Sequence, residues 1–171
     1  MANGNTQTMN DLTEHYAPEA PIHWGAVWSG TLVAMAVMLV LDLLGAAITV
    51  VTLSATTAPT ASAIWTGVVG IIAFFIGGWV TGMSMYKETS GNGAYNGAMV
   101  FMLAVPIMLA LAVLGLGDLA TTFGGLSGNA GGSAGAATQI SNGVIWAALI
   151  DSVLAWIAAA LGGWAGAASQ K

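Results

Sequence analysis

The sequence predicts an all-α, polytopic membrane protein with four transmembrane helices, on three observations. Charged residues make up 5% of the 171 residues and hydrophobic residues 57%, whereas about a quarter of a soluble domain is charged. The apolar residues fall into continuous runs, each long enough to cross about 30 Å of hydrocarbon as a helix. These runs lack the alternation of apolar and polar residues found in membrane-spanning strands. The predicted spans are residues 24–53, 64–86, 95–117 and 144–168.

The segments outside these spans are short and polar. Residues 1–22 form a polar N-terminal tail, and 23–171 form the membrane domain. The tail has no apolar run and no basic residue, so we expect it to remain on the mature chain rather than act as a signal peptide. The predicted connections are a turn at 54–63, a tight loop at 87–94 and a Gly- and Ser-rich stretch at 118–143. Within the third span, Pro106 removes a backbone hydrogen bond and is expected to kink the helix.

The two lysines predict the orientation. Lys87 follows the second span and Lys171 follows the fourth, so both lie on one side of a four-span protein. The positive-inside rule assigns that side to the cytoplasm. We therefore expect a multi-pass membrane protein with both termini cytoplasmic. Most Trp and Tyr residues fall near the span ends, as is usual at membrane interfaces, but Trp156 falls near the middle of its span.

Composition excludes several kinds of site. The chain has no Arg and a net charge of -5, which argues against nucleic acid and against a basic patch for anionic lipids. The absence of Cys removes disulfides, zinc–thiolate sites and iron–sulfur clusters. No catalytic triad or phosphate-binding loop is recognisable. We expect no enzyme activity and no cofactor.

The spans carry a weak internal repeat. Glycines of the first span match those of the third at the same offset, and a Gly-Gly-Trp triplet occurs in both the second and the fourth. Two hairpins, 24–86 and 95–168, are therefore predicted, either as a parallel duplication or because Gly-rich apolar helices match by chance. The matching residues are Gly25-Ala26 and Gly45 with Gly97-Ala98 and Gly117, and Gly77-Gly78-Trp79 with Gly162-Gly163-Trp164.

Small residues recur every four positions in the second and fourth spans. Such stripes let helix backbones approach closely in lipid. They predict either internal packing of a four-helix bundle or contact with another subunit. The candidate packing residues are Gly70, Gly77, Gly78, Gly82, Ala155, Ala159, Gly162, Gly163 and Gly166.

Two acids, Asp42 and Asp151, lie inside spans at similar predicted depth. A carboxylate in the membrane is costly unless it is paired, protonated or hydrated. The spans contain no Lys or Arg to pair with them. Three interpretations stay open: neutral acids bonded to hydroxyls or backbone, pairing with a cation of a partner subunit, or a proton or ion site.

The two histidines offer little. His15 and His23 lie near Glu14 and Glu19, but prolines between them break the helix that a metal site on one helical face requires. We expect no metal site. His23, at the membrane edge, is a weak candidate ligand for a tetrapyrrole, and otherwise a solvated anchor.

Glycine, leucine and aromatic residues form short motifs at Trp24 to Val27, Gly30, Leu43-Leu44-Gly45 and Gly77 to Gly82. These motifs resemble a group of small bacterial inner-membrane proteins of unknown function, sometimes labelled PhnA-like. The resemblance implies a location in the bacterial inner membrane. The group's pattern of glycines and aromatics resembles this chain from residue 22 onward, and it implies a four-helix membrane protein without assigning functional residues. The chain differs at Met83, where the group has Arg, and at Asn96-Gly97, where it tends to have His-Gly.

The sequence therefore favours a non-catalytic structural or accessory subunit. Its expected partners are the lipid bilayer and either a second copy or other membrane subunits. A small oligomeric channel or a proton- or cation-coupled transporter using Asp42 and Asp151 is the alternative. A pigment-associated subunit using His23 is a third.

Overall fold

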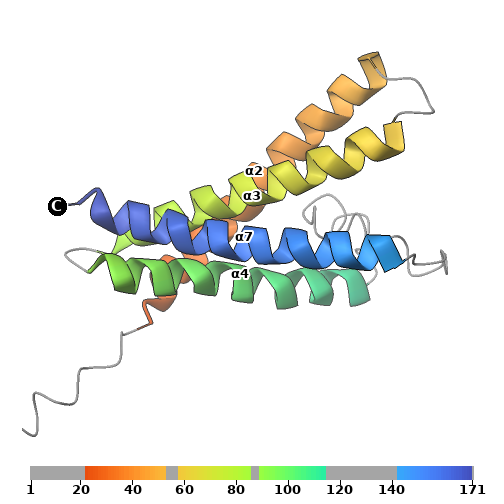
Figure 1. Ribbon diagram of the computed structural model, residues 1–171. Coiled ribbons are helices and arrows are strands. Elements are labelled where there is room, and N and C mark those ends of the chain that lie inside the picture. Colours follow the sequence, from red (N-terminus) through yellow and green to blue (C-terminus); the bar gives the residue numbers. More distant parts are fainter. Residues whose placement is uncertain (1–21, 53–57, 86–88, 115–141, 171) are drawn as a thin grey trace, which may run out of the picture.

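The computed structural model describes residues 22–52, 58–85, 89–114 and 142–170, which form four long helices (Figure 1). Helix α2 is Trp24–Thr52, α3 is Ala58–Ser84, α4 is Ser90–Val113 and α7 is Asn142–Ala168. Each contains a stretch of 20 to 22 residues that is long and apolar enough to cross a membrane. The prediction of an all-helical chain with four helices long and apolar enough to span a membrane is confirmed for the described residues.

Three helices begin earlier than predicted, and α3 and α4 do so by more than one turn. Helix α3 begins at Ala58, inside the predicted turn at 54–63. Pro59 lies in its first turn, where a missing backbone N–H costs no helical hydrogen bond. Helix α4 begins at Ser90, and the hydroxyl oxygen of Thr89 accepts a hydrogen bond from the backbone N–H of Asn92 at 3.4 Å, which caps the helix. Polar composition was a poor guide to loops here, because the first turn of a helix tolerates such residues.

In the second half of the chain, Pro106 lies inside helix α4, as predicted, and the start of α7 differs from the prediction. Helix α4 continues through Pro106, whose ring is exposed on the outer surface. Helix α7 begins at Asn142, two residues before the predicted start at Val144. The rest of the connection predicted at 118–143, and nearly all of the N-terminal tail, lie outside the described residues.

Helix α3 lies at the centre of the arrangement. It contacts the three other helices, most extensively α7, whereas the described parts of α2 and α7 do not contact each other. Helices α3 and α7 run parallel, while α2 is antiparallel to α3 and α4 is antiparallel to α7. Figure 1 shows the C-terminal part of α2 and the N-terminal part of α3 leaning away from α4 and α7.

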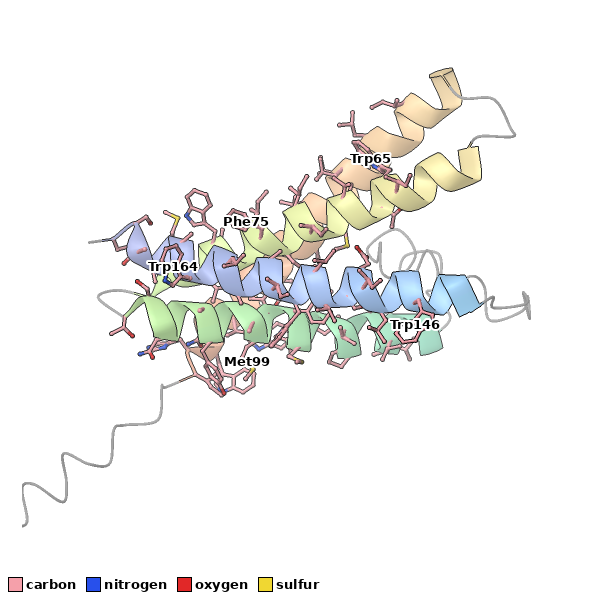
Figure 2. All side chains as sticks on the ribbon, viewed as in Figure 1. Trp65, Phe75, Met99, Trp146 and Trp164 are labelled. Carbon is pink, nitrogen blue, oxygen red and sulfur yellow. The ribbon has the colours of Figure 1, made fainter. Side chains whose placement is uncertain are left out.

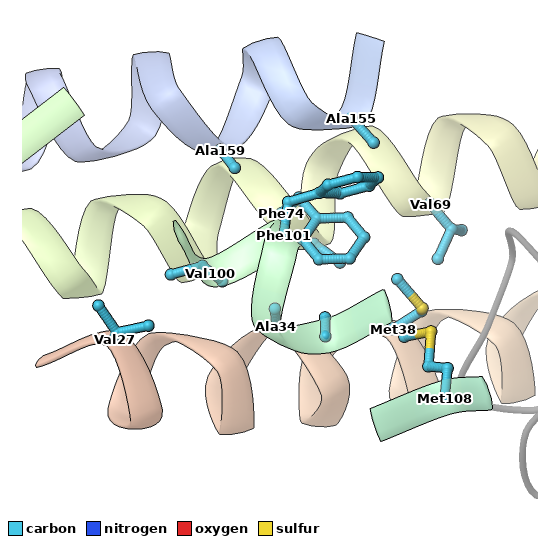
Figure 3. Close-up of a cluster of buried hydrophobic side chains, with 12 residues drawn as sticks. Val27, Ala34, Met38, Val69, Phe74, Val100, Phe101, Met108, Ala155 and Ala159 are labelled. Atoms are coloured by element: carbon cyan, nitrogen blue, oxygen red, sulfur yellow. The ribbon is translucent and has the colours of Figure 1, made fainter. Parts of the chain in front are cut away.

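The core lies where all four helices meet (Figure 3). The rings of Phe74 on α3 and Phe101 on α4 pack edge to face, with centroids 5.1 Å apart. Small and medium side chains surround them, and every helix contributes. The cluster comprises Val27, Ala34, Met38, Val69, Ala73, Phe74, Val100, Phe101, Ala104, Met108, Ala155 and Ala159.

Candidate functional site

Helices α3 and α7 meet backbone to backbone along their small-residue stripes. A Cβ added at Gly78 would overlap the carbonyl oxygen of Ala159, and one at Gly82 would overlap that of Gly163. From the other side, a Cβ at Gly162 or Gly166 would overlap carbonyl oxygens of α3. The contact therefore requires glycine on both helices, as in close parallel helix pairs in lipid.

The second glycine of each Gly-Gly pair faces a different neighbour from the first. A Cβ at Gly77 would lie 2.6 Å from the carbonyl oxygen of Gly30 on α2, whereas Gly78 faces α7. In α7, Gly162 faces α3, whereas Gly163 faces Gly93 and Gly97 on α4. The predicted duplication aligns Gly77 with Gly162, and in a duplicated structure the two residues would have equivalent neighbours. Because their neighbours differ, these contacts do not support the duplication.

The structure brings together eight of the nine candidate packing residues. Ala155 and Ala159 are fully buried, and six glycines meet neighbouring helices. Gly70 is buried, yet a Cβ there would meet nothing within 4 Å.

Sequence reasoning missed four glycines that also pack closely. Gly30 and Gly45 face α3, and Gly93 and Gly97 face α7. The fourfold spacing of Gly93 and Gly97 was the available signal, but assigning Gly93 to a turn concealed it.

Among the described residues, Thr31, Thr81 and Asn96 are polar and fully buried, and each forms hydrogen bonds with the backbone. The hydroxyl of Thr81 shares its proton between the carbonyl oxygens of Gly77 at 3.0 Å and Ala26 on α2 at 3.2 Å. Thr31 donates to the carbonyl of Val27 at 2.8 Å within its own helix. These bonds supply the partners that a buried polar group requires.

Asn96 joins α4 to the start of α2. Its Oδ1 accepts a hydrogen bond from the backbone N–H of His23 at 2.9 Å, and its Nδ2 donates to the carbonyl of Asn92 at 3.0 Å. The side chain of Asn96 is fully buried. His23, the weak cofactor candidate, thus contributes its backbone to an interhelical contact.

The two intramembrane acids lie beside α3 at one level. Trp65 of α3 donates its indole N–H to the carbonyl of Leu41, the residue before Asp42, at 3.2 Å. A Cβ at Gly67 would lie 3.1 Å from Oδ1 of Asp151. Trp65 and Gly67 are two residues apart on α3, about 3 Å along the helix axis. The acids therefore flank the same turn of α3 from two helices that do not contact each other in their described parts.

The surroundings of the two acids differ. Oδ2 of Asp42 is buried and accepts no hydrogen bond from the described residues. Asp151 is half-buried, and its carboxylate lies beside Gly67, where α3 has no side chain. Gly45, one turn after Asp42, packs against the Trp65 indole. The side chains of Ala46 and Thr49, which share that helical face, lie outside the described set.

Most of the residues that were considered as metal ligands in the N-terminal tail are not described by the structure. His15, Glu14 and Glu19 lie outside the described residues. Within the described residues, no group of three or more His, Cys, Asp or Glu side chains is arranged to hold a metal ion.

The outer surface of the helices is strongly apolar. Large side chains are exposed on each helix, for example Leu32 on α2, Ile64 on α3, Leu109 on α4 and Trp146 on α7. Figure 2 shows Trp146 and Trp164 near opposite ends of α7. This surface suits contact with acyl chains, with which apolar side chains mix without cost.

No family model, curated protein or solved structure matches the chain.

Proposed function

We propose that the protein is a non-catalytic subunit of the bacterial inner membrane, which self-associates or packs within a larger membrane complex. The observation that carries the proposal is the backbone-to-backbone packing of α3 with α7 and of α7 with α4 through glycine and alanine. Interhelical hydrogen bonds from Trp65, Thr81 and the backbone of His23 hold α2 to the same unit. Such packing favours a rigid bundle that can serve as a structural element.

The proposed partner contacts fall on the outer surface. The small-residue stripes around Gly78 and Gly163 face neighbouring helices of the same chain, which favours the internal-packing interpretation of those stripes. A partner would therefore meet large exposed side chains such as Leu32 and Leu109. Van der Waals contact of such surfaces can replace contact with lipid.

Native mass spectrometry of the chain extracted in polymer-bounded membrane discs tests this proposal. The chain should be made at its natural level, because overproduction would leave it without partners. We expect it to leave the membrane with a second copy or with a defined partner polypeptide. A parallel extraction from cells lacking the chain identifies polypeptides carried non-specifically. A chain recovered only as a monomer with lipid would contradict the proposal.

Orientation and hairpin organisation belong to the same proposal. We propose that α2 with α3 and α4 with α7 form two antiparallel hairpins and that both termini are cytoplasmic. The side chain of Gln170, just after α7, donates a hydrogen bond to the carbonyl of Met83 near the end of α3. Lys87 and Lys171 therefore follow helices that end on the same side of the bundle, and the positive-inside rule supports assigning that side to the cytoplasm. The resemblance to the PhnA-like group agrees with this membrane placement and contributes no functional residue.

One observation favours a second candidate function, in which the two acids handle protons or cations. Oδ2 of Asp42 is buried without a hydrogen bond from the described residues, and Asp151 lies at the same level of α3. Intramembrane acids commonly mark ion pathways.

The variants Asp42→Asn and Asp151→Asn separate the two functions. Loss of proton or cation flux in proteoliposomes, with the extracted species unchanged, would support ion handling. Loss of the partner with no flux in the unmodified protein would support the subunit. If proteoliposomes with the unmodified protein show no proton or cation flux, the ion-handling function is ruled out.

A further inference from the structure

Asp151 lies where the close contact between α3 and α7 ends. In the C-terminal halves of these parallel helices, a Cβ added at Gly78 would overlap the carbonyl oxygen of Ala159. Counting back eight residues in both helices, about 12 Å along each axis, brings the same alignment to Gly70 and Asp151. A Cβ added at Gly70 would meet nothing within 4 Å. At the level of Asp151 the two backbones are therefore no longer in contact.

The carboxyl group of Asp151 takes the place of that contact. Among the described residues, the atoms within 4 Å of a Cβ added at Gly67 are its Oδ1 at 3.1 Å and its Cγ at 3.6 Å. Asp151 itself is half-buried, whereas Ala155, one turn further along α7, is fully buried in the core cluster. The carboxyl group thus lies between the two helices, at the edge of the packed region.

Beyond this level the helices diverge. Figure 1 shows the N-terminal part of α3 leaning away from α7, together with the C-terminal part of α2. These two leaning segments are joined, because Trp65 of α3 packs against Gly45 of α2 and donates its indole N–H to the carbonyl of Leu41. The described parts of α2 and α7 do not contact each other. The leaning segments are therefore tied to one another, and Gly67 meets α7 through the carboxyl group of Asp151.

No charged group of the described helices that touch α7 balances Asp151. These helices are α3 and α4, and neither contains an Asp, Glu, Lys, Arg or His. The titratable side chain that they do contain is Tyr95, at the end of α4 that packs beside Gly163, about 18 Å from Asp151 along α7. Asp42 lies on α2, across α3. An ionised Asp151 would therefore depend on water rather than on a partner in these helices.

We propose that Asp151 is a proton-controlled latch between the N-terminal halves of α3 and α7. A neutral carboxyl group fits between apolar helices at small cost, whereas an ionised one in a membrane requires water. Water reaches the carboxylate when the N-terminal halves move apart, while the contacts at Gly78 and Gly82 hold the C-terminal halves together. Protonation therefore closes the latch and ionisation opens it. The latch goes beyond both proposed functions, since neither requires a change of shape, and it needs only that the helices span a membrane.

Distances between two spin labels measure this opening, and the absence of native Cys leaves the choice of positions free. Ile64→Cys and Leu149→Cys, both at exposed positions, place the labels in the N-terminal halves of α3 and α7. In liposomes, double electron–electron resonance of the full-length chain should show a longer distance at about pH 9 than at about pH 5, by about 3 Å or more, the width of one water molecule. The pair Met83→Cys and Leu161→Cys, exposed in the C-terminal halves, is the control and should not change.

Variants of Asp151 test the assignment to this side chain. Asp151→Asn keeps the shape but cannot ionise, so the distance between the labels at Ile64 and Leu149 should stay short at both pH values. Asp151→Glu restores an ionisable group and should restore the lengthening, and Asp42→Asn should leave the lengthening unchanged.

Three results would overturn the latch. The first is a distance in the otherwise unmodified chain that is the same at both pH values. The second is equal lengthening in both label pairs, which would mean that the whole bundle responds to pH. The third is a lengthening that persists in Asp151→Asn or disappears in Asp42→Asn, which would assign the response to another group. The comparison with Asp42→Asn decides the question even if Asp151→Asn fails to fold.

Discussion

Asn96 shows how a single polar residue can connect helices in an apolar interior. Its amide receives the backbone N–H of His23 and donates to the carbonyl of Asn92. A backbone N–H near the start of α2 has no partner within its own helix, because the first turn lacks preceding carbonyls. The buried amide supplies that partner and thereby sets where α2 begins relative to α4.

Replacing Asn96 should therefore weaken the fold. Asn96→Leu has a similar size but removes both hydrogen bonds, and we expect the free energy of unfolding to fall by about 1–2 kcal/mol. Thermal unfolding in detergent, followed by intrinsic tryptophan fluorescence, measures the effect. Tyr95→Phe, at the exposed neighbouring position, is the control and should leave the melting temperature unchanged. An Asn96→Leu variant as stable as the unmodified protein would refute the assigned role.

Two buried threonines allow a matched comparison of interhelical and local hydrogen bonds. Thr81 bonds across to α2 as well as to its own helix, whereas Thr31 bonds only within its own helix. Thr81→Val should therefore cost more stability than Thr31→Val, by about 0.5–1 kcal/mol. The two variants remove the same atom from side chains that are both fully buried. Equal losses in melting temperature would show that the contact from Thr81 to Ala26 contributes nothing to stability.

At the scale of elements, α3 serves as the common neighbour of the other helices. One of its faces holds Gly77 and Thr81 against α2, and another holds Gly78 and Gly82 against α7. Phe74 lies between these faces and contacts Phe101 of α4. Helix pairs in lipid gain little from burial of apolar surface, so close backbone contact on two faces supplies most of the attraction.

This arrangement predicts opposite effects of adding one methyl group at two glycines of α3. Gly78→Ala places a Cβ against the carbonyl of Ala159, so the helices must separate, at an expected cost of about 1–3 kcal/mol. Gly70→Ala meets nothing within 4 Å and should be neutral or stabilising by up to about 1 kcal/mol, because alanine favours the helix. Melting temperatures of the two variants test the pair. A Gly70→Ala variant as damaged as Gly78→Ala would contradict the packing described for α3.

For the whole molecule, the proposed orientation can be tested directly because the chain contains no Cys. Leu114, at the end of α4, and Ser169, just after α7, are both exposed, and single cysteines can replace either. A membrane-impermeant maleimide added to intact spheroplasts should label Leu114→Cys, while Ser169→Cys should react only after permeabilisation. The reverse pattern would place both termini outside and contradict the use of Lys87 and Lys171 as cytoplasmic markers.

Much of the fold could be predicted from apolar runs, but their boundaries could not. The span predicted from Ile64 begins at Ala58 in the structure, and the one predicted from Tyr95 begins at Ser90. Both differences fall in polar first turns, where hydropathy carries no signal and a cap such as Thr89 determines the start. The acids were identified from sequence because charge inside an apolar run is a local anomaly.

The sequence by itself determined that this chain forms four apolar helices able to span a membrane. The reason is local, because a segment in lipid must satisfy its backbone hydrogen bonds within itself and therefore becomes a helix. Only the tertiary structure decided that Gly77 faces α2 while Gly78 faces α7, that Gly93 belongs to a helical contact, and that Asp42 and Asp151 flank one turn of α3. These contacts depend on how helices that are distant in sequence align and which faces they turn toward each other. Small residues allow close approach on several faces of a helix, so only the packing of all helices together selects the faces in contact.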